Sequence, residues 1–280
     1  MAQTEERDEI DELAARFAAM PEFPLAVRAY VVNMMHMRQN LRLLNKLISH
    51  HARWRIAAFL LYLDADRERF GPDGGATYSN LLGMCQRRAE IKPRVLKTVL
   101  ALLQITGSVS VVRRQDDRRS KFYRPTERMH EFTRQWMGHA AKMLEILEPE
   151  KRRSELLGDD PGFSNRFLVS SGRAHLTSVP LIERMPKYIA RGARDGADAV
   201  QLDVLLADMD GVPVPSRAML AKKYGFSKTQ ITAVIAEGVA QGSYTLNEVG
   251  VPMATPYLRK SFSKWVSIEL AFYAVHMRVS

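Results

Sequence analysis

The chain has 280 residues, 46% of them hydrophobic, which is enough to bury a substantial core and to build two domains. Its 41 Lys and Arg residues outnumber its 31 Asp and Glu residues, and the formal charge of +10 favours a polyanionic partner. A single cysteine excludes an internal disulfide framework, and no apolar run reaches the length of a membrane span. Because the N-terminus is acidic where a signal peptide would be basic, we expect a cytoplasmic protein with no membrane partner.

Two helices are expected in the first fifty residues. Thr4–Met20 has its apolar residues on one side and ends at Pro21 and Pro24, so residues 1–24 are interpreted as an acidic arm that docks on a partner. Leu25–His51 has helical apolar spacing with no proline or glycine. Two interpretations of this second helix stay open, an ordinary core helix and a helix through which two copies of the chain dimerise. The inward residues of the first helix are Ile10, Leu13, Ala14 and Phe17.

A small module follows, beginning with a helix over Trp54–Asp66, a glycine-rich loop over Gly71–Gly75, and a helix that Ser79 can cap. Pro93 fits the first turn of the next helix, because its missing N–H costs nothing there. Apolar residues recur after it at three- and four-residue steps: Val95, Leu96, Val99, Leu100, Leu102 and Leu103. Arg94, Lys97 and Thr98 fall on the opposite face, and a cationic, hydrogen-bonding helix face suits the major groove of DNA.

Gly107 ends that helix, and a hairpin follows. Val109 and Val111 alternate with serines as a half-buried strand, and Lys121–Arg124 returns beside it. Residues 113–120 between them suit only a solvated tip. This order of helix, strand and basic turn is typical of a winged helix-turn-helix. Thirteen Lys and Arg face five Asp and Glu over Met84–Arg134, and the candidate DNA contacts are Arg87, Arg88, Lys92, Arg94, Lys97, Thr98, Arg113, Arg114, Arg118, Arg119 and Lys121.

Over Arg55–Leu147 the chain resembles the MarR family of bacterial transcription regulators. The resemblance rests on Asp117-Arg118-Arg119 in the hairpin and on Pro125-Thr126-Glu127, which opens the next helix. It implies that Asp117 orients a neighbouring arginine toward the minor groove, with Arg118 or Arg119 making the contact.

A domain boundary is predicted after the helix over Glu127–Leu147. Residues 149–162 hold two prolines and two glycines among many charges, which is typical of a linker. The predicted organisation is therefore a scaffold helix with the first module over 25–148, a linker over 149–162, and a second module over 163–280.

The second module is predicted from an internal repeat. Ser216–Gly225 and Ser227–Gln241 show helix-turn-helix spacing, with glycine in the turn and aliphatic residues anchoring the second helix. A shift of 135 residues aligns Ile91 with Phe226, Leu96 with Ile231, Val99 with Val234, Leu100 with Ile235 and Gly107 with Gly242. Its candidate DNA contacts are Ser227, Lys228, Thr229 and Gln230, and its hairpin tip, Asn247–Pro252, lacks arginine. A last helix, Pro256–His276, is expected to pack against Glu127–Leu147.

Other reactive residues give weaker signals. Cys85 aligns with the inward Leu220, which favours a buried thiol over a redox sensor. No histidine stands in a metal-ligand spacing, and no catalytic motif occurs, so we expect neither a cofactor nor an enzyme. Tyr30, His36 and Trp54 are candidates for a small-molecule effector cavity, with plain core packing as the alternative.

The sequence thus predicts a mainly α fold with small β-hairpin wings, in which tandem winged helix-turn-helix modules join scaffold helices. The predicted function is sequence-specific binding of double-stranded DNA by a transcription regulator. A replication initiator or chromosome-organising protein, and a protein-interaction scaffold, are the two alternatives.

Overall fold

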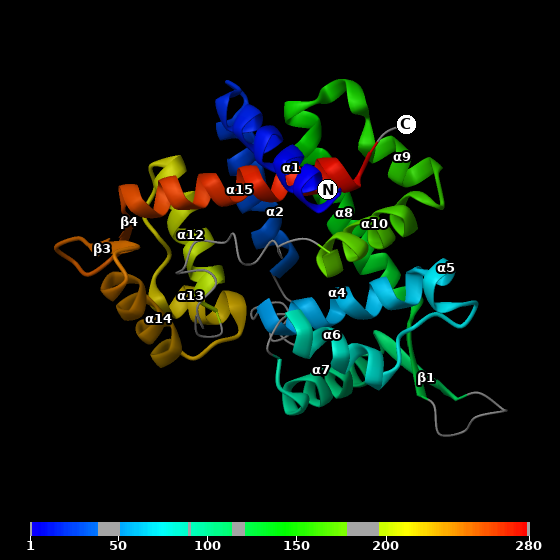
Figure 1. Ribbon diagram of the computed structural model, residues 1–280. Helices are drawn as coiled ribbons and strands as arrows, with labels where there is room; N and C mark the ends of the chain where they lie inside the picture. Colours follow the sequence, from blue (N-terminus) through cyan, green and yellow to red (C-terminus); the bar gives the residue numbers. More distant parts are fainter. Residues whose placement is uncertain (1, 39–50, 89–90, 114–120, 178–195, 279–280) are drawn as a thin grey trace.

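The computed structural model describes residues 2–38, 51–88, 91–113, 121–177 and 196–278 (Figure 1). Most of these residues are helical, and two short antiparallel hairpins supply the sheet structure, as the sequence predicted. In the described part of the chain, no helix is both long and apolar enough to traverse a lipid bilayer.

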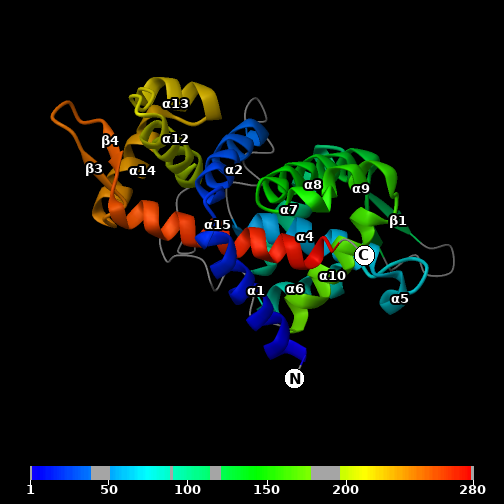
Figure 2. The same ribbon diagram turned by 90° about the horizontal axis from the view of Figure 1, so that it is seen from above.

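The first helix packs within its own chain. α1 (Ala2–Ala19) buries Ile10, Ala14 and Phe17, the face that its spacing predicted, and it lies against α15 (Pro256–His276) in both views (Figures 1 and 2). The segment expected to dock on a partner therefore docks on the C-terminal helix of the same chain.

The second helix, α2 (Phe23–Arg38), has Pro24 in its first turn and joins the two halves of the protein. It packs against α8 (Glu127–Leu147) on one side and against α12 (Ala197–Asp210) on the other. Arg28 pairs with Asp210 at 2.8 Å, which ties α2 to the end of α12. Its buried residues are Phe23, Ala26, Val27, Tyr30, Val31 and Met35, so its apolar face is covered by the same chain. Residues 39–50 of the predicted dimer helix lie outside the described residues.

The first unit runs through α4 (His51–Ala65), α5 (Arg67–Phe70), α6 (Tyr78–Arg88), α7 (Pro93–Ile105), β1 (Val109–Arg113), β2 (Lys121–Pro125) and α8. α7 begins at Pro93, and α8 has the bounds that the sequence predicted. The cap of α6 was predicted wrongly. Thr77 Oγ1, rather than Ser79, accepts the Asn80 N–H at 3.2 Å, because the helix already begins at Tyr78.

The first hairpin extends beyond the core. β1 and β2 are antiparallel, with Val109 opposite Pro125 and Arg113 opposite Lys121. The backbone N–H of Tyr123 also donates to the Ala76 carbonyl at 2.8 Å, so the loop before α6 supports the other edge of β2. Val109 is buried but Val111 is 38% exposed, so the predicted half-buried strand is buried only at its first residue. The reason is that the hairpin extends away from the helices after its first residue pair, so the rest of β1 has no core to pack against.

The second unit repeats the same order of elements: α12, α13 (Arg217–Tyr224), α14 (Lys228–Ala240), β3 (Tyr244–Leu246), β4 (Pro252–Ala254) and α15. α7 begins at Pro93 and α14 at Lys228, and β1 begins at Val109 and β3 at Tyr244, so both pairs are offset by the predicted 135 residues. The helices after the hairpins, α8 and α15, each have 21 residues.

The repeat extends to single hydrogen bonds. Gly107 and Gly242 both adopt left-handed backbone angles, φ 68° and φ 72°, which favour glycine after the helix. The Thr126 hydroxyl donates to the Gly107 carbonyl at 2.7 Å, and the Thr255 hydroxyl donates to the Gly242 carbonyl at 2.8 Å. Such equivalent contacts indicate two copies of one supersecondary unit.

The two copies fill one core position differently. In the first, Leu103 of α7 and Val109 of β1 are both buried. The equivalent residues in the second are Gly238 and Tyr244. A Cβ on Gly238 would lie 2.2 Å from Cε2 of Tyr244, so the tyrosine ring occupies the space that a leucine side chain would need.

Residues 149–162, predicted as a linker, are folded. η1 (Pro149–Lys151), α9 (Arg153–Asp159) and α10 (Phe163–Thr177) follow α8 directly. Arg153 is 1% exposed, donates to Glu148 at 2.8 Å, and reaches the Met277 carbonyl at 3.1 Å. Arg153 is therefore paired inside the protein, whereas Arg152 and Glu155 of the same segment pair with each other on the surface.

The last helix joins all parts of the described chain. α15 runs from the second hairpin across the molecule to α1, α8 and α10 (Figures 1 and 2). Trp136 of α8 and Tyr273 of α15 meet edge to face with ring centroids 5.2 Å apart, which confirms the predicted pairing of these helices. The two units thus lie at fixed positions on a shared helical core.

Candidate nucleic-acid interface

The helix α7 is divided cleanly between core and surface. Leu96, Val99, Leu100 and Leu103 are at most 2% exposed and hold the helix on α4 and α6. On the opposite side, Lys92, Arg94 and Lys97 are exposed within the first two turns. Because no acidic residue stands in the first turn, this end of the helix keeps its full positive potential.

Thr98 lies on the same exposed face. Its hydroxyl donates to the Arg94 carbonyl at 3.0 Å, one turn earlier in the helix. The hydroxyl oxygen can still accept a hydrogen bond, so Thr98 is suited to contact a donor such as a base amino group.

Tyr78 belongs to this surface, although the sequence did not single it out. Lys97 Nζ lies 6.0 Å from the centre of its ring, a cation–π distance that connects the starts of α6 and α7. Tyr78 precedes Lys97 by nineteen positions across a helix and a turn, so no local spacing could have revealed the contact.

The base of the first hairpin carries two further cations. Arg113 ends β1 and Lys121 begins β2, and the antiparallel register places these exposed residues opposite each other. Of the other predicted hairpin contacts, Arg114, Asp117, Arg118 and Arg119 lie outside the described residues. Arg87 and Arg88 end α6, and only their backbone is described.

Two cations that the sequence counted in the basic stretch are neutralised. Arg124 donates to Asp64 at 2.9 Å and to Asp73 at 3.3 Å, which fastens β2 to α4 and to the loop after α5. Arg134 pairs with Glu127 and with Glu131 on α8, and its hydrogen bond lowers the pKa of Glu131. In contrast, none of five exposed cations forms an ion pair with another described residue, and these are Lys92, Arg94, Lys97, Arg113 and Lys121.

The second unit has the same geometry with fewer available charges. Ser227 caps α14 by accepting the Gln230 N–H at 3.1 Å, so its predicted base contact competes with a structural role. Lys228 and Thr229 are exposed in the first turn, and Gln230 is half-buried. Lys223 of α13, another cation of this unit, pairs with the buried Asp203 at 2.7 Å.

The second hairpin is apolar where the first is basic. Leu246, Val249 and Met253 are 45%, 81% and 45% exposed, and the turn between the strands has no Lys or Arg. A cation from α13 reaches this turn, because Arg217 donates to the Gly250 carbonyl at 3.4 Å. The two hairpins therefore offer different chemistry on the same scaffold.

Of the remaining candidate residues, Cys85, Tyr30 and Trp54 pack inside the protein and His36 does not. Cys85 is fully buried, and burial raises the pKa of its thiol to about 11, so the predicted inward position is confirmed. Tyr30 packs on Phe262 and donates to Glu269 at 2.6 Å, while Trp54 packs edge to face on Trp136. Tyr30 and Trp54 thus follow the alternative of core packing, and His36 is exposed on α2.

Comparison with known proteins gave no relative: no family model, no curated protein and no solved structure matches this chain. The function must accordingly be inferred from the geometry and charge described above.

Proposed function

We propose that the chain is a sequence-specific DNA-binding protein, with the first unit acting as a winged helix of the MarR type. In this proposal α7 enters the major groove and the β1–β2 hairpin follows the neighbouring backbone into the minor groove. The supporting observation is that five exposed cations, which form no ion pair with another described residue, lie on these two elements: Lys92, Arg94, Lys97, Arg113 and Lys121.

The side chains on α7 divide into two roles. Arg94 and Lys97 point away from the core with Thr98, where Arg94 can donate two parallel hydrogen bonds to a guanine. Lys92 at the start of the helix is placed for a phosphate, which a helix N-terminus also favours. The hairpin cations Arg113 and Lys121 would neutralise further phosphates, and Arg118 or Arg119, oriented by Asp117, would reach the minor groove.

The second unit gives the expected binding site its asymmetry. Lys228, Thr229 and Gln230 on α14 can contact a second half-site, but the apolar hairpin beside them offers no cation to phosphate. One chain would therefore cover two unequal half-sites, the first bound by helix and hairpin and the second by helix alone. We propose that such a protein regulates transcription in the cytoplasm. The alternative role, a replication initiator, would be revealed by footprints near a replication origin.

Selection from a random duplex library with the full chain tests the proposal. Several rounds of capture and sequencing should enrich one motif, and a fluorescent duplex carrying it should bind at least a thousandfold more tightly than scrambled DNA. Failure to enrich any motif, together with equal affinity for all duplexes, would contradict sequence-specific binding.

A protein-docking role for the second unit is the competing candidate, because its hairpin exposes Leu246, Val249 and Met253. Val249→Asp tests whether this hairpin contacts DNA, since DNA affinity should stay unchanged if it does not. A loss of DNA affinity in this variant would instead place the hairpin in the DNA interface.

A further inference from the structure

The two units are joined through α2, which lies between α8 of the first unit and α12 of the second in both views (Figures 1 and 2). Its buried face, which includes Val27 and Val31, supplies apolar packing. Apolar packing is not directional, and units joined in this way move against each other unless the interface is large or specific contacts fix it. The directional contacts of α2 therefore determine how the two units are placed.

Two arginines of α2 hold α12 at both of its ends. Arg28 donates to both carboxylate oxygens of Asp210, the last residue of α12, at 2.8 and 3.1 Å. Arg38, the last residue of α2, pairs at 2.7 Å with Asp198 in the first turn of α12. The two helices are thus antiparallel, and the two ion pairs lie about 15 Å apart along α2. These two pairs, called the α2 clamp below, oppose both sliding and rotation, because a bidentate pair also fixes the angle between its partners.

A third contact joins α2 to α15. The Tyr30 hydroxyl donates to Glu269 at 2.6 Å, and the Tyr30 ring meets Phe262 edge to face with centroids 5.8 Å apart. The other carboxylate oxygen of Glu269 accepts a hydrogen bond from Tyr273 of its own helix, which holds the carboxylate in place. α2 thus contacts two helices of the second unit as well as α8 of the first.

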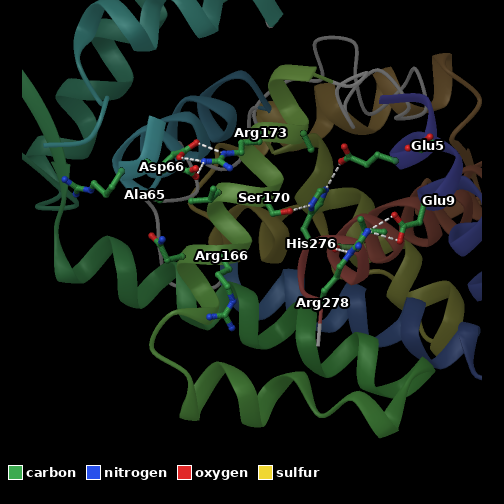
Figure 3. A pocket seen from close by; sticks show the side chains of 16 residues that line it. Glu5, Glu9, Ala65, Asp66, Arg166, Ser170, Arg173, His276 and Arg278 are labelled. Carbon is green, nitrogen blue, oxygen red and sulfur yellow. Dashed lines mark hydrogen bonds and ion pairs between the residues drawn. The ribbon is translucent and has the colours of Figure 1, made fainter. Parts of the chain in front are cut away.

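The opposite end of α15 is anchored to α1 and α10, where these helices line a groove of about 850 Å³ (Figure 3). His276 Nδ1 lies 2.8 Å from Ser170 Oγ, and His276 Nε2 lies 3.4 Å from Glu6 Oε1. Arg278, just after the helix, pairs with Glu9 at 2.7 Å. These contacts lie at the end of α15 that is remote from the second hairpin. They fix the helix along its axis, whereas the α2 clamp fixes the second unit around that axis.

We propose that the α2 clamp sets the distance and the angle between α7 and α14, so that Arg28 and Arg38 determine which spacing of two half-sites the protein accepts. This inference rests on the proposed DNA binding. Each base pair added between the half-sites moves the second one by about 3.4 Å along the duplex and by roughly 35° around it. Two clamped units cannot follow such a shift without losing contacts to DNA. The spacing is therefore part of the specificity, without a base contact from either arginine.

Distances between spin labels, measured by electron paramagnetic resonance without DNA, test the α2 clamp itself. The labels are placed on Ala101→Cys of α7 and Ala236→Cys of α14 in a Cys85→Ala chain, because these alanines are exposed and equivalent in the two units. The distribution of distances should be narrow. Arg28→Ala combined with Arg38→Ala should widen it roughly twofold, since units without specific contacts move against each other. An unchanged width would overturn the clamp.

Arg134→Ala combined with Arg259→Ala is the matched control. These arginines pair with Glu131 and with Asp208, and each of the two ion pairs lies inside a single unit. The control removes the same charge as the clamp variant and should keep the narrow distribution. A control that widens the distribution equally would contradict a specific role of α2.

A charge exchange tests whether the pairing itself holds the units. Arg28→Asp alone should widen the distribution, and Arg28→Asp with Asp210→Arg should narrow it again, because the ion pair forms with its charges reversed. A distribution that stays wide in the exchanged variant would contradict the pairing. Thermal unfolding shows which variants are folded, and Arg28→Ala alone, which opens a half-exposed pair, replaces the double variant if that variant is unfolded.

Duplexes with one or two base pairs inserted between the half-sites of the selected motif test the spacing role. The native chain should lose about tenfold or more in affinity, because contacts to one half-site are misplaced. The variant without the clamp should lose about threefold or less, because a loosely joined unit can follow its half-site. Equal losses would overturn the spacing role even where the label distances widen. If the native chain selects no motif, DNA binding fails and the spacing role with it, while the label distances still test the clamp.

Discussion

Exchanging one pair of core residues between the two units tests whether they are copies of one structure. Leu103 and Val109 of the first unit correspond to Gly238 and Tyr244 of the second. The two pairs carry about seven and about eight side-chain heavy atoms, and swaps that conserve volume usually cost less than about 1.5 kcal/mol. Gly238→Leu combined with Tyr244→Val should therefore give a stable protein.

Each single substitution should be costly. Gly238→Leu places Cβ 2.2 Å from the Tyr244 ring, so about 1 to 3 kcal/mol or more of overpacking outweighs the gain of roughly 1 kcal/mol in helix propensity. Tyr244→Val removes most of a buried ring and leaves a cavity worth about 2 to 4 kcal/mol. Burial raises the pKa of Tyr244, so the phenol that is removed is neutral and leaves no charge behind.

Urea unfolding of the four proteins measures the coupling between the two sites. A favourable interaction of about 2 to 3 kcal/mol in the double-mutant cycle is expected, at the upper end for contacting residues. If the double variant loses as much unfolding free energy as the two single variants together, the two cores are not equivalent. The two units would then share only the order of their helices and strands. The reciprocal exchange, Leu103→Gly with Val109→Tyr, should show coupling of the same sign.

Three further predictions concern single sites. The Arg173 hydrogen bonds lower the pKa of Asp66, so this pair stabilises the protein above the usual carboxyl pKa of about 3.9. In urea unfolding, the difference in stability between the native chain and Arg173→Gln should therefore decrease as the pH falls below that value. A difference that increases would contradict the pairing. Because Cys85 is buried with a pKa of about 11, labelling by a disulfide reagent at pH 8 should proceed at the unfolding rate, and rapid labelling of the folded chain would refute this burial. Arg94→Ala should relax base preference at one position by about 1 to 3 kcal/mol in a repeat of the site selection, whereas a uniform loss over all sequences would make Arg94 a phosphate contact.

Much of the fold could be predicted because helical periodicity and glycine or proline punctuation agreed along the chain. Pro93 marks a helix start, and Gly107 and Gly242 mark helix ends, as the structure confirms. The 135-residue offset followed from four apolar positions and this pair of glycines. The cap at Thr77 was missed because Ser79 also carries a hydroxyl, and sequence spacing does not decide between two neighbouring caps.

Long-range pairing was beyond what the sequence could predict. Arg153 belongs to the segment predicted as a linker, but it donates to the Met277 carbonyl, 124 positions away. Ser170 and His276 are 106 positions apart, so no motif contained the groove that they line. Charge counting also failed for Arg124, because Asp64 neutralises it from another helix. Local patterns thus reveal elements and exposed faces, whereas the pairing of buried charges depends on tertiary structure.

The salt dependence of DNA affinity in one triple variant tests the central proposal most directly. Lys92→Ala, Arg113→Ala and Lys121→Ala together remove three exposed cations from α7 and the first hairpin. If each of these cations neutralises one phosphate, the plot of log affinity against log salt concentration should be less steep than that of the native chain. The magnitude of its negative slope should decrease by about 2.7, at roughly 0.9 per contact. The control replaces Arg7, Lys142 and Lys264, exposed cations on α1, α8 and α15, with alanine, so the net charge changes equally and the native slope should remain. Equal slopes for the two triple variants would contradict DNA binding through α7 and the first hairpin.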